Sequence, residues 1–317
     1  MKKNIRQFLV LTGLATGCIY GLNKFIETTS GIKKLLNEHT GYFFEWRYGN
    51  IFYTKQGEGS PLLLIHDLHP ASSSVEWSRI IRKLSKDHTV YTIDLLGCGR
   101  SDKPNLTYTN YMYVQLITDF VKKIIGEKTD AIATGSSCSF TLMAANMDET
   151  IFEKLFFISP ASLESMQLNP DKKSNFGKKI LEFPIIGTFV YNLQMTEDKI
   201  NELFEKEYYR KKTLISSKLK DTYYESAHAD HGNGRFLFGS IFGNYTNINI
   251  IPALKKIENP IFIIGSRDTE ESIRRMDSYV KYDETIETAY ISNCNKLPQL
   301  EDPNKLCDIL AMFYNDK

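Results

Sequence analysis

The segment between residues 131 and 145 constrains the fold of this chain more than any other. An apolar run, five small residues and a helix-compatible run follow one another at 131–134, 135–139 (Gly-Ser-Ser-Cys-Ser) and 140–145. A backbone that passes sharply from a strand into a helix tolerates only small side chains around the turn, because strand and helix nearly touch there. The pattern therefore predicts a strand, a sharp turn and a helix, with Ser137 at the apex of the turn.

Apolar runs and helical patterns alternate along much of the chain. The runs at 61–66, 88–94, 155–159, 260–265 and 287–291 have the composition of buried strands. Several of them are separated by segments with helical periodicity, which is typical of right-handed crossover connections. An aromatic-rich hairpin around Gly49-Asn50 precedes them. We expect an α/β fold with a mostly parallel central sheet flanked by helices.

The alternation divides the chain into five segments. Residues 1–26 form an apolar N-terminal helix, and 27–41 a polar linker. Residues 42–159 and 252–317 carry the two parts of the α/β core. Helical patterns without strands occupy 160–251, which we interpret as a helical cap inserted into the core.

The N-terminal segment has the composition of a signal anchor. Lys2, Lys3 and Arg6 precede an uncharged stretch at 8–22. We expect a single-pass transmembrane helix with the domain on the extracytoplasmic side, since cationic flanks stay inside. A lipoprotein modified at Cys18 and a soluble amphipathic helix are the alternatives.

Composition excludes several classes of function. The net charge is only +1 over 317 residues, so the composition lacks the excess of basic residues that is typical of nucleic-acid-binding proteins. The five cysteines are scattered without a C-x-x-C pair, so we expect no metal site. The glycines of Gly97-Cys98-Gly99 lack the third glycine of a nucleotide loop, and we expect no cofactor.

From about residue 42 to its end, the chain resembles the α/β-hydrolase superfamily, in the capped branch that holds esterases, dehalogenases and epoxide hydrolases. Five segments carry the resemblance in chain order: 64–77 (an H-G-type loop with His66-Asp67), 94–104 (D-x-x-G-x-G-x-S-x-x-P), 135–139 (G-x-S-x-S), 260–268 (a strand and a G-x-x-D turn) and 297–303 (the stretch after the family histidine).

The resemblance implies roles for individual residues. Ser137 corresponds to the nucleophile of a nucleophile elbow, and Asp268 to the acid of the triad. The backbone N–H groups of Leu68 and Cys138 correspond to the oxyanion hole. The family histidine would stand at 296, where this chain has a lysine.

The missing histidine leaves three interpretations open. Lys296 could act as the base, although an adjacent Asp268 would stabilise its ammonium form. A histidine from elsewhere could replace it: His228 or His231 on the cap, or His66 or His69 beside the oxyanion loop. In the third interpretation the site is a remnant, with Lys296 and Asp268 as a structural ion pair.

The oxyanion loop departs from the family as well, because Asp67 stands where the family has glycine. A carboxylate beside a developing oxyanion is unfavourable unless it is neutralised. We therefore hypothesise that Lys296 pairs with Asp67.

Two functions follow from this sequence. The first is a serine hydrolase of an ester, thioester or amide that uses Ser137 with an atypical base. The second is an inactive pseudohydrolase that binds a small molecule or a partner in the same pocket. The Phe, Tyr and Leu residues of the predicted cap favour a partly apolar substrate or ligand.

Overall fold

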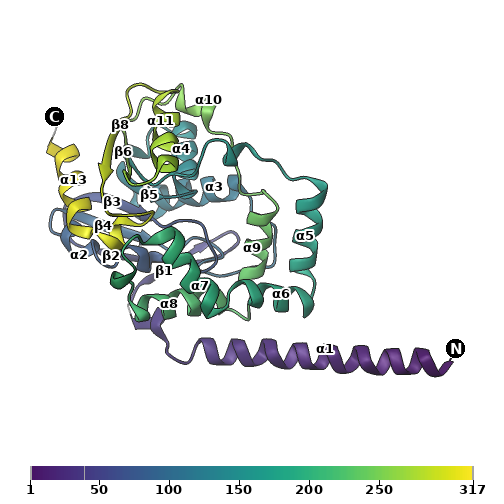
Figure 1. Cartoon of the computed structure of the whole chain (residues 1–317). Helices are drawn as coiled ribbons and strands as arrows, with labels where there is room; N and C mark the ends of the chain where they lie inside the picture. Colours follow the sequence, from purple (N-terminus) through teal and green to yellow (C-terminus); the bar gives the residue numbers. More distant parts are fainter. Residues whose placement is uncertain (1, 39, 316–317) are drawn as a thin grey trace.

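The computed structural model describes residues 2–38 and 40–315, and its centre is an eight-stranded sheet (Figure 1). The strand order is β1-β2-β4-β3-β5-β6-β7-β8. β2 is antiparallel to both of its neighbours, and the pairings from β4 to β8 are all parallel. The strands are β1 Tyr42–Trp46, β2 Gly49–Gln56, β3 Ser60–Ile65, β4 His88–Ile93, β5 Thr129–Thr134, β6 Phe152–Ile158, β7 Ile261–Ser266 and β8 Glu287–Ile291.

The continuous apolar runs form strands because both faces of the sheet are covered by helices. In β5, Ala131 and Ala133 belong to the apolar cluster that includes α3 (Asn110–Phe120) and α4 (Ser137–Met147). Ile132 belongs to the cluster on the opposite face, with α13 (Pro303–Asn315). Alternate side chains of one strand point to opposite faces, so a strand buried on both sides must be apolar throughout.

The remaining elements connect these strands. They are α1 Lys2–Ser30, η1 Leu35–Glu38, η2 Ser74–Trp77, α2 Ile81–Leu84, η3 Val121–Ile125, η4 Ser165–Gln167, α5 Lys172–Glu182, α6 Ile186–Gln194, α7 Glu197–Leu203, η5 Phe204–Tyr208, η6 Lys212–Leu214, α8 Ser217–His228, α9 Gly234–Phe242, α10 Ile251–Leu254, α11 Glu270–Val280 and α12 Pro298–Glu301.

The expected hairpin is present, but its turn lies two residues earlier than predicted. Trp46 pairs with Gly49, so the turn residues are Arg47 and Tyr48. Gly49 opens β2 with a φ of +147°, and a side chain there would overlap Asp102. The glycine is needed for this close approach and not for the turn, so a Gly-Asn pair at this place is not a turn signal.

The segment 160–251 is helical and contains no strand among its residues, all of which the structure describes. Its aromatic side chains pack mainly on one another, with Phe204, Tyr208, Tyr209 and Tyr223 at the centre of the cluster. We call α5 to α9 the inserted helices. The division into five segments stays a prediction.

Helix α1 extends from the body as a long rod (Figure 1). The Asn23 side chain joins it to the inserted helices: its amide donates to the Ile185 carbonyl (2.9 Å) and its carbonyl oxygen accepts from Asn192 (3.0 Å). The helix that contains residue 7 is long and apolar enough to cross a membrane, and little of its apolar stretch is buried. The predicted cationic end, Lys2, Lys3 and Arg6, lies outside the residues whose side chains are described.

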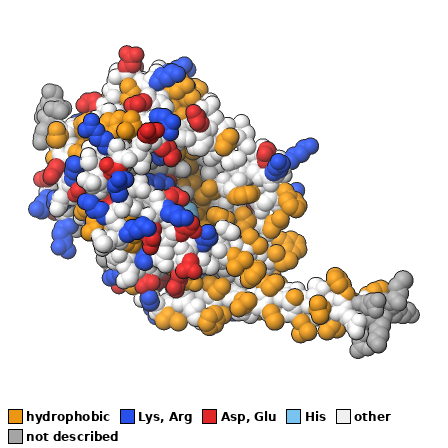
Figure 2. Space-filling view, in the orientation of Figure 1, with side chains coloured by type: hydrophobic (Ala, Val, Ile, Leu, Met, Phe, Trp, Pro, Cys, Tyr) orange, Lys and Arg blue, Asp and Glu red, His pale blue; other side chains and the backbone are white. Residues whose placement is uncertain are grey.

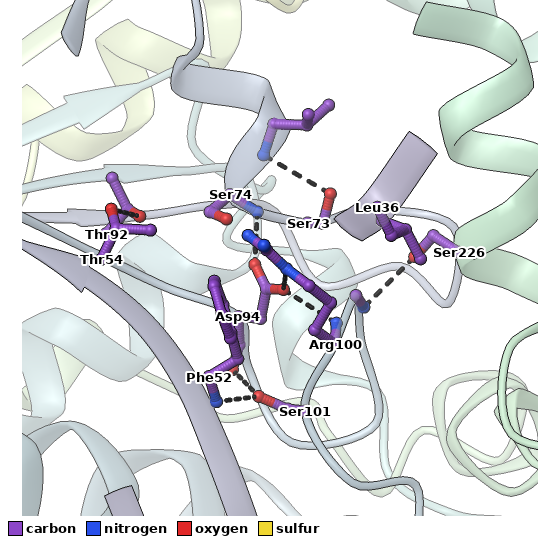
Figure 3. A network of polar contacts seen from close by, with 12 residues as sticks. Leu36, Phe52, Thr54, Ser73, Ser74, Thr92, Asp94, Arg100, Ser101 and Ser226 are labelled. Carbon is purple, nitrogen blue, oxygen red and sulfur yellow. Dashed lines mark hydrogen bonds and ion pairs between the residues drawn. The ribbon is translucent and has the colours of Figure 1, made fainter. Parts of the chain in front are cut away.

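A buried carboxylate ties the loop after β3 to the loop after β4 (Figure 3). Asp94 accepts hydrogen bonds from the backbone N–H groups of Ser74 (2.7 Å) and Arg100 (2.8 Å). The hydroxyl of Ser226, on α8, accepts from Gly99 N–H at 3.2 Å. These bonds hold the loop that carries residues 66–74 in place above the carboxyl ends of the strands.

Candidate functional site

The turn between β5 and α4 has Gly135 at its apex. The strand pairing continues to Thr134, and Gly135 has a φ of +59°. Helix α4 begins at Ser137, two residues later. Ser137 is therefore not at the apex, which corrects the interpretation of the turn from sequence. The small residues around the apex are Ala133 and Ser137 instead of Gly135 and Ser139.

Ser137 lies buried in the first turn of α4. Its hydroxyl donates a hydrogen bond to the backbone carbonyl of His66 at 2.6 Å. Among the described residues, no hydrogen bond joins this hydroxyl to the side chain of a lysine or a histidine. The structure thus places the proposed nucleophile in a packing position between the helix and the loop after β3.

The carboxylate of Asp67 occupies the space in front of the apex. A side chain built on Gly135 would overlap this carboxylate. The Oδ1 atom accepts hydrogen bonds from two backbone N–H groups, those of Leu68 and Ser136, each at 2.9 Å. Leu68 is one of the expected oxyanion donors, and Ser136 is the residue after the apex. The N–H of Cys138, the other expected donor, instead donates to the carbonyl of Gly135 at 3.4 Å.

Lys296 pairs with the second oxygen of the same carboxylate. Its Nζ lies 2.7 Å from Asp67 Oδ2, as hypothesised from the sequence. Burial alone would raise the pKa of Asp67, but Lys296 and the Ser136 N–H outweigh it and hold that pKa below its ordinary value. Burial would lower the pKa of Lys296, but Asp67 outweighs it and raises that pKa above its ordinary value. Both groups are charged at neutral pH.

Asp268 lies apart from this pair, although it follows β7 where the resemblance puts the acid. Its Oδ2 accepts from the N–H of Cys294 at 3.2 Å and lies 3.6 Å from Arg210 Nε. Between the described side chains of Lys296 and Asp268 there is no ion pair. The structural pair expected between them is replaced by the pair of Lys296 with Asp67.

The two histidines of the oxyanion loop are held neutral. His66 Nε2 accepts from the N–H of Leu95 at 3.0 Å, so Nδ1 carries the proton and donates to the carbonyl of Asp67 at 2.7 Å. Burial lowers the pKa of His66. Burial lowers the pKa of His69 to about 4, and its Nδ1 accepts from Ala71 N–H. Neither ring makes a hydrogen bond to Ser137 in the described structure.

The two cap histidines are engaged elsewhere. His228 Nδ1 lies 2.8 Å from the carbonyl of Tyr224 within α8, and burial lowers the pKa of His228. His231 is exposed and its Nδ1 contacts the Glu27 carboxylate at the end of α1. Their recorded partners lie on α8 and α1, away from Asp67 and Lys296.

A second buried carboxyl group, missed from the sequence, lies beneath Asp67. Glu76 is fully buried; its Oε2 accepts from the N–H of Asp67 at 3.3 Å and its Oε1 from the Gln299 amide at 2.7 Å. Burial and the neighbouring Asp67 charge raise the pKa of Glu76 to about 8. Its place next to Trp77, within the predicted H-G-type loop of residues 64–77, is the signal that the sequence offers.

A cleft of about 440 Å³ reaches Lys296 from the outside. Polar and charged side chains dominate its lining, whereas the buried aromatic side chains of the inserted helices pack on one another and do not line it. The lining residues are Ser159, Lys206, Glu207, Ser266, Thr269, Glu271, Ser272, Arg275, Asn295 and Lys296. In the part of the chain that the structure describes, no group of three or more His, Cys, Asp or Glu residues is placed to hold a metal ion.

The overlap at the apex predicts a coupling between Gly135 and Asp67. We expect Gly135→Ala to destabilise the protein by more than about 2 kcal/mol, because an added Cβ combines left-handed strain with overlap. The double variant Asp67→Gly/Gly135→Ala should lose less unfolding free energy than Asp67→Gly and Gly135→Ala lose together, by about 1 kcal/mol or more. Denaturant unfolding of the four proteins in detergent measures this coupling.

Gly126→Ala is the matched control. Gly126 also has a left-handed φ, of +80°, but a Cβ there would meet no atom within 4 Å. Its strain should add to the effect of Asp67→Gly without coupling. Equal couplings at the two glycines would contradict the assignment of the apex to Gly135 and Asp67.

Because its pKa is raised from 4.5 to about 8, Glu76 should make the free energy of unfolding decline as the pH rises from 4.5 to about 8. The folded protein binds the Glu76 proton more tightly than the unfolded chain does. This contribution is therefore complete below pH 4.5 and is lost as the pH rises through about 8. We expect Glu76→Gln to flatten this decline in a series of denaturation curves, whereas Glu58→Gln, on an exposed turn, should leave the decline unchanged. A decline of the same size in Glu76→Gln would contradict the prediction.

The comparisons with known proteins agree with this architecture. The chain is 34% identical over 71 residues to 2-hydroxy-6-oxo-6-(2'-aminophenyl)hexa-2,4-dienoic acid hydrolase of Metapseudomonas resinovorans, covering 22% of this chain and 24% of that protein. It is 30% identical over 108 residues to the soluble epoxide hydrolase of Corynebacterium sp. strain C12, covering 33% and 36%. The matched regions thus span only a quarter to a third of these relatives.

Solved structures of similar shape extend the comparison over the whole chain. A meta-cleavage product hydrolase from Pseudomonas fluorescens IP01 matches with a TM-score of 0.69 and 17% identity, over 87% of this chain and 98% of that one. A bacterial membrane phospholipase A matches with a TM-score of 0.68 and 20% identity, over 99% and 98%. A family model described as the alpha/beta hydrolase family matches residues 62–309. The chain therefore belongs to the alpha/beta hydrolase family.

Proposed function

We propose that this protein is a membrane-tethered member of the family that does not hydrolyse its ligand and binds a small polar molecule in the cleft beside Lys296. The observation that carries the proposal is the position of Asp67 Oδ1, within 2.9 Å of the N–H groups of both Leu68 and Ser136. The protein's own carboxylate takes the place that a reacting oxygen would need.

Acyl transfer requires preorganised donors for the negative charge that develops on the substrate oxygen. Here both donors are already bonded to an oxygen that is negatively charged. A second negative charge at this position would be repelled by Asp67, and the Lys296 ammonium already compensates the first. The apex residue, Gly135, offers no side chain that could attack a substrate.

The serine-hydrolase alternative would use Ser137 as nucleophile, Lys296 as base and Asp268 as acid. It requires Lys296 to leave Asp67, lose its proton and reach a hydroxyl that now donates to the His66 carbonyl. The raised pKa of Lys296 works against this, because a general base must be unprotonated at the working pH. A histidine base would require similar rearrangements of His66, His228 or His231.

The lining of the cleft favours a polar ligand, whereas the cap composition led us to expect a partly apolar one. Hydroxyl, amide, ammonium, guanidinium and carboxylate groups line it, so a small organic molecule with several hydrogen-bonding groups fits this lining. The similar hydrolases are named for small organic molecules, which agrees with a ligand of that size.

The tether is the apolar stretch of α1. Moving a helix of this length and apolar exposure from water into a bilayer core is favourable, and the aligned membrane phospholipase A covers the chain along nearly its full length. The extracytoplasmic position of the domain remains a prediction from the cationic residues before the stretch.

The absence of a nucleophilic centre predicts no labelling by a fluorophosphonate probe. We expect the full chain in detergent to show the same background signal as Ser137→Ala at neutral and at alkaline pH, because the Ser137 hydroxyl is buried and has no base. In-gel fluorescence measures the signal. The triple variant Asp67→Gly/Gly135→Ser/Lys296→His is the comparison protein. It removes the carboxylate from the N–H groups of Leu68 and Ser136, places a serine at the apex and places a histidine at position 296.

Labelling that depends on Ser137 in the unmodified protein would overturn the proposal in favour of the serine hydrolase. Labelling of the triple variant but not of the unmodified protein would support the proposal. It would show that the three replaced residues are the reason why the unmodified protein is not labelled. Circular dichroism and thermal unfolding establish that each variant is folded before its signal is compared.

The cleft predicts a bound small molecule in the protein as isolated from cells. We expect native mass spectrometry of the full chain, released from detergent, to show an added mass that Ser272→Trp loses, because a large side chain there fills the cleft. Arg274→Trp, on the same helix α11 but outside this cleft, is the control and should keep the added mass. The same added mass in both variants, or none in the unmodified protein, would contradict binding in this cleft.

A further inference from the structure

The inserted helices carry an exposed apolar face on α5 and α6. Hydrophobic side chains gather over α9, α5 and α6 and continue along α1 (Figure 2). The exposed members are Phe176 and Ile180 on α5, Phe183 directly after α5, and Ile186 and Leu193 on α6.

The spacing of these residues makes them one surface. Phe176 and Ile180 are four residues apart and therefore share one side of α5, and Phe183 follows Ile180 by three residues, directly after the helix ends. Ile186 and Leu193 are seven apart and share one side of α6. A helix that served only to cover the core would bury such a stripe, and a water-facing helix would carry polar residues there.

Phe242, at the end of α9, extends this face. Its ring lies against Gly177 of α5 and it is 53% exposed. Three aromatic rings thus project from neighbouring helices into the surroundings. We call the set Phe176, Ile180, Phe183, Ile186, Leu193 and Phe242 the apolar face.

The tether leaves the body beside this face. Asn23 of α1 bonds to the Ile185 carbonyl at the turn between α5 and α6, and to Asn192 on α6. Beyond Asn23, α1 projects past α6 and away from the body (Figure 1). From Ile5 to Leu22 the helix rises ~27 Å, close to the thickness of a bilayer core. A bilayer crossed by this stretch would have one surface next to Asn23, where α1 contacts α6. The apolar face lies on the side of the body toward which α1 projects.

Lysines flank the apolar face. Lys172, Lys173 and Lys179 are exposed on α5, and within the described part of the chain none of them forms an ion pair. Exposed cations beside inserted aromatic rings match the anionic headgroups and the interfacial zone of a bilayer. A second copy of the chain would set these lysines against identical lysines if the faces met around a two-fold axis.

We propose that the apolar face enters the interfacial zone of the bilayer as a second membrane contact, which orients the domain on the membrane. The proposal rests on the tether of the proposed function, but it concerns a different surface. Two contacts at one end of the molecule suppress the rotation that a single helix allows. The contact also provides burial for aromatic side chains that otherwise face water.

Depth-dependent quenching in vesicles tests this proposal on the full chain. Single cysteines replace Phe176 or Phe183 in a Cys18→Ser/Cys307→Ser background and carry a small fluorophore, while the other cysteines are buried. The vesicles contain phosphatidylcholine, phosphatidylglycerol and a lipid with a nitroxide near its headgroup. We expect severalfold stronger quenching at both positions than at Glu58→Cys, which lies on the β2–β3 turn away from the inserted helices.

Labelled native Cys18, in a Cys307→Ser background, reports on the tether separately. Quenching at Cys18 without quenching at positions 176 and 183 would overturn the proposal while leaving the tether intact. Absence of quenching at all three positions would overturn both the tether and the contact. Neither result bears on the lack of hydrolysis, which the fluorophosphonate experiment decides.

A second arm distinguishes lipid from another protein copy. Lys172→Glu/Lys173→Glu/Lys179→Glu should weaken the quenching in vesicles with phosphatidylglycerol and change it little in pure phosphatidylcholine. Energy transfer between donor-labelled and acceptor-labelled copies at position 183, in place of quenching by lipid, would assign the face to a dimer and overturn the proposal.

Discussion

The site depends on the contacts of the Asp67 carboxylate with three partners: Leu68 N–H, Ser136 N–H and the Lys296 ammonium. It joins three separate parts of the chain: the loop after β3, the turn after β5 and the loop after β8. A buried carboxylate is tolerated only where its lost hydration is replaced, and these partners supply hydrogen bonds and an opposite charge. The chain around this contact has the alpha/beta hydrolase fold, and the carboxylate fills the space in front of the apex.

Asp67, Gly135 and Lys296 depend on one another. With a side chain at the apex in place of Gly135, the carboxylate would have no room. With histidine instead of Lys296, the buried charge would lose a cation that is always protonated at neutral pH. With glycine instead of Asp67, the half-buried Lys296 would lose its partner. The three residues therefore form one interdependent unit around an internal ion pair, with the buried Glu76 beneath it.

The surface of the molecule is organised around a different constraint. The inserted helices bury their own aromatic cluster against Leu297 and Leu300 and still expose a second apolar stripe on α5 and α6. The proposed membrane at the level of Asn23 would cover both the exposed apolar stretch of α1 and this stripe. We propose separate ligands for the two surfaces: a small molecule for the polar cleft at Lys296 and a lipid surface for the apolar face.

The sequence alone determined the fold, because a strand buried on both faces must be continuously apolar and the order of such strands and helices restricts the topology to few solutions. It also located the substituted residues Asp67 and Lys296, and their opposite charges sufficed to predict that they pair. The tertiary structure decided which residue is the apex. The strand ends at Thr134, as the sequence predicts, but α4 already begins at Ser137, so the turn is shorter than the five residues expected and its apex is Gly135 instead of Ser137. It also decided that Asp268 and the histidines have other partners and that Glu76 lies under the site. Hydrogen bonds between distant segments follow from packing in three dimensions, which residue spacing along the chain does not encode.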